Sequence, residues 1–75
     1  VEEALDRYRE ALVISEANDL RMQIGELLAR LGGVAPDRQR RMEYLQRALS
    51  VFRELGAQAR MRDVQMMVHT AVMGR

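Results

Sequence analysis

The chain has 75 residues, of which 48% are hydrophobic and 31% charged. This composition is too apolar for intrinsic disorder and is typical of one small helical domain or of part of one. The sequence has no cysteine, which excludes a disulfide framework, a thiolate zinc site and a cysteine nucleophile. The formal net charge of +1 is too small to indicate a nucleic-acid or membrane partner.

No stretch of the sequence is long and apolar enough to cross a membrane, and none has the pattern of a signal peptide. By elimination we expect a cytoplasmic protein. Its basic side chains are all arginine, which is compatible with the coding bias of a GC-rich bacterium. The first residue, Val1, is already in phase with a helical pattern, so we expect the chain to be a piece of a longer protein.

A first amphipathic helix is predicted over residues 2–17, because apolar or small residues recur there every three or four positions. These residues are Val1, Ala4, Leu5, Tyr8, Ala11, Leu12 and Ser15. Val13 and Ile14 widen the apolar stripe. They predict a second neighbour at that end of the helix.

A second helix is predicted over residues 19–31, with Asn18 in a left-handed turn before it and Asp19 as its N-cap. Its expected core residues are Leu20, Ile24, Leu27, Leu28 and Leu31. Gly25 lies inside this helix, where glycine costs about 1 kcal/mol relative to alanine. We therefore expect another helix to pass very close to Gly25.

Gly32 and Gly33 are expected to end the second helix, and Pro36 with Asp37 to begin a third helix over residues 37–55. The expected core residues of this third helix are Met42, Leu45, Ala48, Leu49, Phe52 and Leu55. Its apolar stripe is the most continuous in the chain.

Gly56 is expected to end the third helix, and a fourth is predicted over residues 57–72. One face of the fourth helix carries Met61, Val64, Val68 and Ala71, and the apolar surface is widened by Met66, Met67, Val72 and Met73. No segment has the alternating pattern of a strand. The sequence therefore predicts an all-α fold of about four helices arranged as antiparallel hairpins.

The helical pattern also repeats. The segment from Tyr8 to Ile14 aligns with the segment from Leu45 to Val51, and each precedes a turn and another helix. A helix pair that recurs every thirty to forty residues is typical of helical solenoids.

Three groups of residues resemble the tetratricopeptide repeat (TPR). Ile24-Gly25 and the run from Leu28 to Gly32 resemble the signature of its first helix, and Ala48-Leu49 resembles that of its second. Ala4-Leu5, Tyr8 and Ala11-Leu12 resemble the second helix of a preceding repeat. The segment 52–56 is similar to longer repeat variants of bacterial regulatory and signalling proteins.

The resemblance implies a short right-handed superhelix that acts as a non-catalytic protein-interaction module, with the first helices of the repeats lining its concave face. At the matching positions of this chain, the residues expected to contact a peptide or a partner domain are Met22, Glu26, Ala29 and Arg30.

Two other functions stay open. In the first, the wide apolar face of the fourth helix and the end of the first bury against a second copy of the chain, giving a homodimer. The second is an arginine-based nucleic-acid-binding helical bundle that would use Arg38, Arg40, Arg41, Arg60 and Arg62. The first three of these arginines are also a candidate anion or acidic-partner patch, because guanidinium groups match carboxylate and phosphate oxygens. No aromatic residues interleave with them, which argues against single-strand binding.

No catalytic or metal-binding pattern is present. His69, the one histidine, has no carboxylate three or four residues away, and Ser15, Ser50 and Thr70 have no local base. The sequence has neither a phosphate-binding loop nor a calcium-binding loop. We therefore expect no enzymatic activity, no cofactor and no metal.

Overall fold

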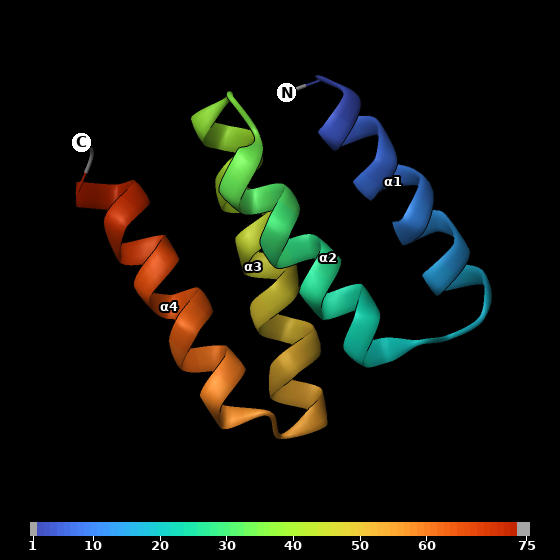
Figure 1. The fold of residues 1–75 in the computed structure, drawn as a ribbon. Helices are drawn as coiled ribbons and strands as arrows, with labels where there is room; N and C mark the ends of the chain where they lie inside the picture. The colour runs from blue at the N-terminus through green and yellow to red at the C-terminus, as the bar shows by residue number, and fades with distance from the viewer. Residues whose placement is uncertain (1, 74–75) are drawn as a thin grey trace.

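The computed structural model describes residues 2–73, which form four α-helices and no strand. The helices are α1 (Glu2–Ala17), α2 (Arg21–Val34), α3 (Arg38–Leu55) and α4 (Gln58–Met73). Consecutive helices run in opposite directions, so α1 begins and α4 ends at the same edge of the molecule (Figure 1). The predicted all-α fold of antiparallel helical hairpins is confirmed.

Each helix packs mainly on the next one along the chain, and the most extensive contact is between α2 and α3. These two helices form the centre of the molecule, with α1 and α4 on either side (Figure 1). The resulting shape is a flat slab of 36 × 31 × 15 Å. A slab this thin leaves the outer faces of the first and last helices open to solvent.

The core is richest where α2 meets α3. Phe52, Leu28, Leu31 and Leu45 are almost completely buried. The full cluster of buried core residues is Leu5, Leu12, Ile24, Leu28, Leu31, Leu45, Ala48, Leu49, Phe52 and Val64. Most of the predicted apolar stripes therefore face the core as expected, while Val1 lies outside the described residues. Three predicted core residues are wrong. Leu20 and Leu55 stand beside the turns with 41% and 42% of their surfaces exposed, and Met42 is half-buried outside the core cluster.

Side chains of α3 occupy the space beside Gly25 and Gly32 of α2. A methyl group on Gly25 would lie 2.5 Å from Cε1 of Phe52, and one on Gly32 would lie 2.5 Å from Cδ2 of Leu45. Contact at Gly25 was expected, and its partner is an aromatic ring rather than a bare backbone. Because protein interiors are close-packed, neither position has room for a side chain unless its neighbour moves.

The prediction that Gly32 and Gly33 end the second helix is wrong. The helix continues through both glycines to Val34, and the N–H of Ala35 still donates to the carbonyl of Leu31 at 2.9 Å. Close packing explains a glycine at this helical position, because Leu45 occupies the space that a side chain on residue 32 would need. The link to α3 is therefore only residues 35–37.

The two hairpin turns are copies of one another at an offset of 37 residues. After α1, Leu20 N–H donates to Ser15 at 2.9 Å, and Asp19 has the positive φ of 54° that a left-handed helix end requires. After α3, Ala57 N–H donates to Phe52 at 2.9 Å, and Gly56 has φ 68°. The same turn therefore occurs twice, at the 37-residue offset of the aligned segments 8–14 and 45–51.

The predicted roles of Asn18 and Asp19 are wrong. Asp19, not Asn18, takes the left-handed conformation, since a short polar side chain tolerates it better than most. Leu20 precedes α2, which has no side-chain N-cap. At α3 the predicted start is close, but Pro36 and Asp37 precede the first turn instead of lying in it. Asp37 is the N-cap and accepts a 3.1 Å hydrogen bond from the N–H of Gln39.

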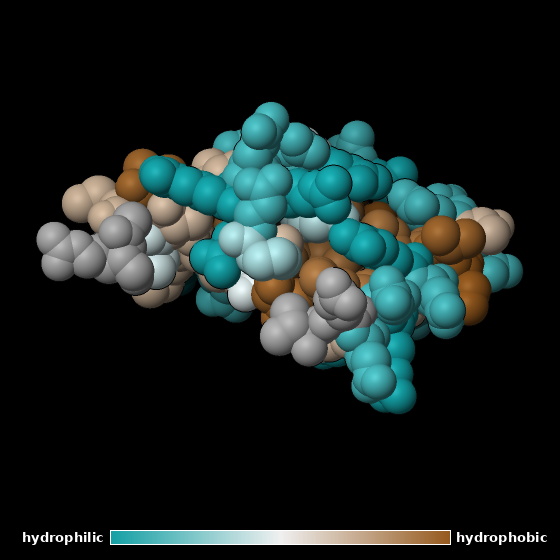
Figure 2. Space-filling view, turned by 90° about the horizontal axis from the view of Figure 1, so that it is seen from above, coloured by the Kyte–Doolittle hydropathy of each residue, from teal (hydrophilic) through white to brown (hydrophobic). Residues whose placement is uncertain are grey.

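Apolar surface gathers at the two ends of the slab. Figure 2 shows brown and tan residues at the α4 end, on the left, and at the α1 end, on the right, with hydrophilic residues covering much of the middle. The exposed large apolar residues of the outer helices are Val13, Ile14, Met66, Val72 and Met73. Among the described residues, no helix covers Val13 and Ile14. The second neighbour that the sequence predicts for them stays a prediction.

Candidate interaction surface

Three of the four predicted partner-binding residues line a hollow between α2 and α4. Glu26, Ala29 and Arg30 come from α2, and the opposite wall comes from α4. The complete lining is Glu26, Ala29, Arg30, Phe52, Arg60, Asp63, Val64 and Met67. The fourth predicted residue, Met22, is 40% exposed but lies outside this lining.

The α2/α4 hollow has an apolar floor and a charged rim. Its volume is about 190 Å³, and Ala29 leaves room beside the buried Val64 and the half-buried Met67. On the rim, Glu26 forms an ion pair with Arg60 that joins the two helices. This combination can hold an apolar side chain on the floor while the rim contacts the polar backbone of a bound segment.

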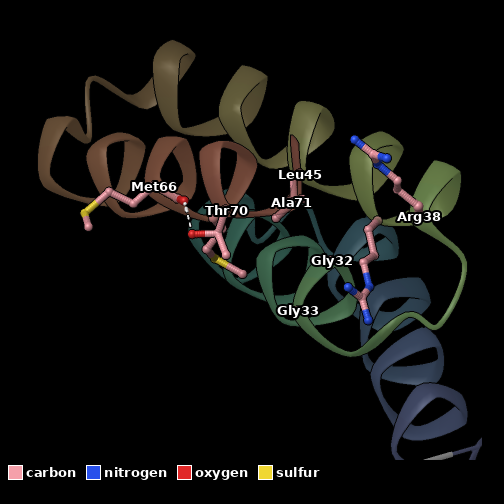
Figure 3. Close-up of a pocket in the computed structure, with 9 residues that line it drawn as sticks. Gly32, Gly33, Arg38, Leu45, Met66, Thr70 and Ala71 are labelled. Atoms are coloured by element: carbon pink, nitrogen blue, oxygen red, sulfur yellow. Dashed lines mark hydrogen bonds between the residues drawn. The ribbon is translucent and has the colours of Figure 1, made fainter. Parts of the chain in front are cut away.

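A second, larger hollow lies beyond the first, where the end of α2, the start of α3 and the end of α4 meet. Its volume is about 530 Å³. It is lined by Gly32, Gly33, Arg38, Arg41, Leu45, Met66, Met67, Thr70 and Ala71. In Figure 3, Leu45, Thr70 and Ala71 lie in the middle, Met66 extends outward at one end, and Arg38 lies at the other. Met67 lines both hollows, so they adjoin at this side chain.

The structure divides the predicted arginine patch. Arg38 and Arg41 line this second hollow. Arg40 instead lies against α1, in a depression with Leu5 and Arg9, and pairs with Asp37 at 4.0 Å. Three arginines within four consecutive residues therefore lie on two different sides of the molecule.

The other two arginines of the nucleic-acid alternative do not extend this patch. Arg60 is in the α2/α4 hollow and paired with Glu26, and Arg62 is exposed elsewhere on α4. The five arginines thus do not line one common hollow.

The sequence predicted the α4 side of the hollows only in part: it offered Met61, Met66, Met67 and Met73 as an adaptable surface and Arg60 as a nucleic-acid contact, but did not place them opposite α2. Arg60, Asp63 and Met67 approach α2 only because the two hairpins stack, and no local pattern gives the angle at which they do so. Met66 and Met67 do line the hollows, and the role of the methionines in binding stays a prediction.

The described residues contain no group of three or more histidine, cysteine or acidic side chains placed to hold a metal ion. His69 is exposed on α4. Among residues 2–73, no helix has both the length and the apolarity to cross a membrane.

Comparison of the chain with models of protein families, with curated proteins and with solved structures gave no match. The fold of the described residues is an all-α arrangement of antiparallel helical hairpins.

Proposed function

We propose that the chain is a non-catalytic, TPR-like interaction module that binds a peptide or a partner domain along the α2/α4 hollow. The observation that carries this proposal is the convergence of Glu26, Ala29 and Arg30 with the facing side chains of α4. In this proposal the module works in the cytoplasm, as part of a bacterial regulatory or signalling protein.

Two features of the molecule support an interaction role. The hairpin repeats every 37 residues, close to the 34 of the tetratricopeptide repeat, and stacked helical repeats create extended surfaces that are used for binding. The hollow also offers a partner both apolar contact and charged groups, which are the ingredients of a specific protein interface.

The proposal is tested by selecting ligands from a random peptide library and mapping the bound peptide by amide chemical shifts. We expect the shifts to centre on Glu26, Arg30 and Asp63. Replacing Arg30 with glutamate should weaken binding about tenfold, because it reverses a charge at the rim. The matched control is Arg53→Glu on α3, which should change affinity less than about twofold. Unchanged binding by a folded Arg30→Glu variant would contradict the proposal.

Self-association is a second candidate, supported by the exposed apolar residues of the outer helices. Val13 and Ile14 of α1 are 64% and 61% exposed, and Met66 and Met73 of α4 are each 66% exposed. Exposed apolar clusters of this kind mark interaction surfaces when they are contiguous. Light scattering across a concentration series tests this candidate: a dimer whose dissociation is promoted by Ile14→Ser supports it, and a monomer at high concentration eliminates it.

A further inference from the structure

The hollow shared by α2, α3 and α4 has an apolar interior. Leu45 is 1% exposed and forms part of the wall, while Gly32 and Gly33 contribute no side chain. The tip of Met67 lies close to Gly33, since a methyl group added to that glycine would be 3.3 Å from Cε of Met67. The volume of about 530 Å³ is within the range of sites that hold small ligands or single bulky side chains.

Two cationic groups at this hollow are held in place by backbone rather than by carboxylates. Arg38 Nη2 donates to the carbonyl of Val72 at 3.1 Å, and Arg41 Nε donates to the carbonyl of Ala35. Among the described residues, no carboxylate lies within ion-pair distance of either guanidinium. Each guanidinium has five N–H donors, so most of them remain free for a ligand.

We propose that this hollow binds an acidic peptide segment that places a carboxylate on Arg38 and Arg41 and an adjacent large apolar side chain against Leu45 and Ala71. The charge is complementary, and forked guanidinium groups bind carboxylates in a defined geometry. This inference rests on the proposed function and extends it by naming the chemistry of the partner.

A peptide fits the surface better than the other anions that arginine binds. Because Met67 lines both hollows, an extended chain can run from the arginines into the α2/α4 hollow. A nucleic acid would require stacking aromatic side chains or a broad basic face. The chain has only two tyrosines and one phenylalanine as aromatic residues, and its net charge is +1. None of the three lines this hollow.

The test uses short blocked peptides and the isotope-labelled chain. The probe alternates glutamate and leucine, and its two controls replace either every glutamate with glutamine or every leucine with serine. We expect the probe to shift the amides around Arg38, Arg41 and Ala71. Either control peptide should bind about tenfold more weakly, because it lacks the charge or the apolar contact.

Matched variants test the site itself. Arg38→Gln with Arg41→Gln should weaken the probe about tenfold or more, and Ala71→Leu should weaken it by filling the hollow. Arg40→Gln removes the same charge from the neighbouring position and should change binding less than about twofold. Circular dichroism establishes that each variant is folded.

Several outcomes overturn the inference: no binding of the probe, shifts centred elsewhere, or equal weakening by Arg40→Gln. Tighter binding of dodecanoate or of a poly-uridine oligomer at the same residues would assign the hollow to another ligand class. If the acidic probe fails while library peptides still bind at Glu26 and Arg30, this inference is wrong and the proposed function stands. If both fail, the proposed function is wrong as well.

Discussion

The two hairpins of the molecule have the same turn conformation, but the helices that follow the two turns differ in the residues on one face. In α1–α2 and in α3–α4 the same backbone hydrogen bonds recur 37 residues apart. On the helix that follows each turn, the residues of α2 that face α3 correspond to polar residues of α4. The pairs are Gly25 with Arg62, Leu28 with Gln65, and Gly32 with His69.

The comparison shows that the turn sets the direction of the chain, whereas the residues on the helix face determine whether another helix can pack there. The turn sends the chain back antiparallel in both hairpins, yet only α2 has glycines where Phe52 and Leu45 of the next helix fit. A helix packed on α4 in the same way would bury Arg62 and His69, both now exposed, and burial of such groups without partners is costly. This face of α4 is therefore mixed in character, since the exposed Met66 and Met73 lie beside Arg62 and His69 at a helical spacing of three or four residues.

The largest effect is expected from Phe52→Ala in the α2–α3 contact. Phe52 is 1% exposed, and removal of a buried phenylalanine ring costs about 3–5 kcal/mol. That is a large part of the stability of a domain this small. At the corresponding position of the first hairpin, Ser15→Ala should cost only about 1 kcal/mol, since Ser15 loses one 3.3 Å hydrogen bond to Gln23. Urea unfolding measures both, and similar losses would contradict the comparison.

Alanine at the two contact glycines should destabilise the fold by about 1–2 kcal/mol. Overpacking against Phe52 or Leu45 costs about 1–3 kcal/mol, and the better helix propensity of alanine returns up to about 1 kcal/mol. Gly33→Ala is the control, since it meets only the flexible tip of Met67. It should be neutral or stabilise by up to about 1 kcal/mol. A gain in melting temperature for Gly25→Ala would show that α3 does not approach as described.

The shared turn predicts opposite signs at its two equivalent positions. Gly56→Ala should destabilise by about 1 kcal/mol, because φ of 68° is unfavourable for a residue with a Cβ. Asp19→Gly should stabilise by about 0.5 kcal/mol, because it relieves the same conformation. Thermal unfolding of both variants tests whether the turns are equivalent, and effects of the same sign would argue against it.

The smallest effects are expected on the outer face of α4. Arg62→Ala and His69→Ala should change the free energy of unfolding by less than about 0.5 kcal/mol, because both side chains are exposed. The contrast with Gly25 and Gly32, their counterparts in α2, is the point of the measurement. A loss above about 1 kcal/mol for either variant would reveal a packed partner on α4.

Much of the fold could be predicted from local signals. The apolar period gave α1 its bounds, and Asp37 and Gly56 lie at the two ends of α3 as expected. Gly32 and Gly33 could not be interpreted in the same way, because a glycine pair indicates either a helix end or a close contact. Here Leu45, a residue of another helix, decides between the two.

The candidate site was predictable on one side only. Glu26 and Arg30 follow from the repeat pattern, and the structure brings them into a hollow, although their role in binding stays a prediction. The separation of Arg40 from Arg38 and Arg41 follows from the helical period, because residues three apart share a face of α3 and Arg40 lies on another. Which neighbouring helix each of these faces meets is set by core packing over the whole molecule, which no single segment encodes.

The central claim is that α2 and α3 are held at the distance that a glycine and a phenylalanine ring define. A double-mutant cycle between Gly25→Ala and Phe52→Leu, measured by urea unfolding, tests it most directly. The smaller leucine should make room for the added methyl group, so the two changes should couple by about 1 kcal/mol in the favourable direction. Additive effects, with no coupling, would contradict the account.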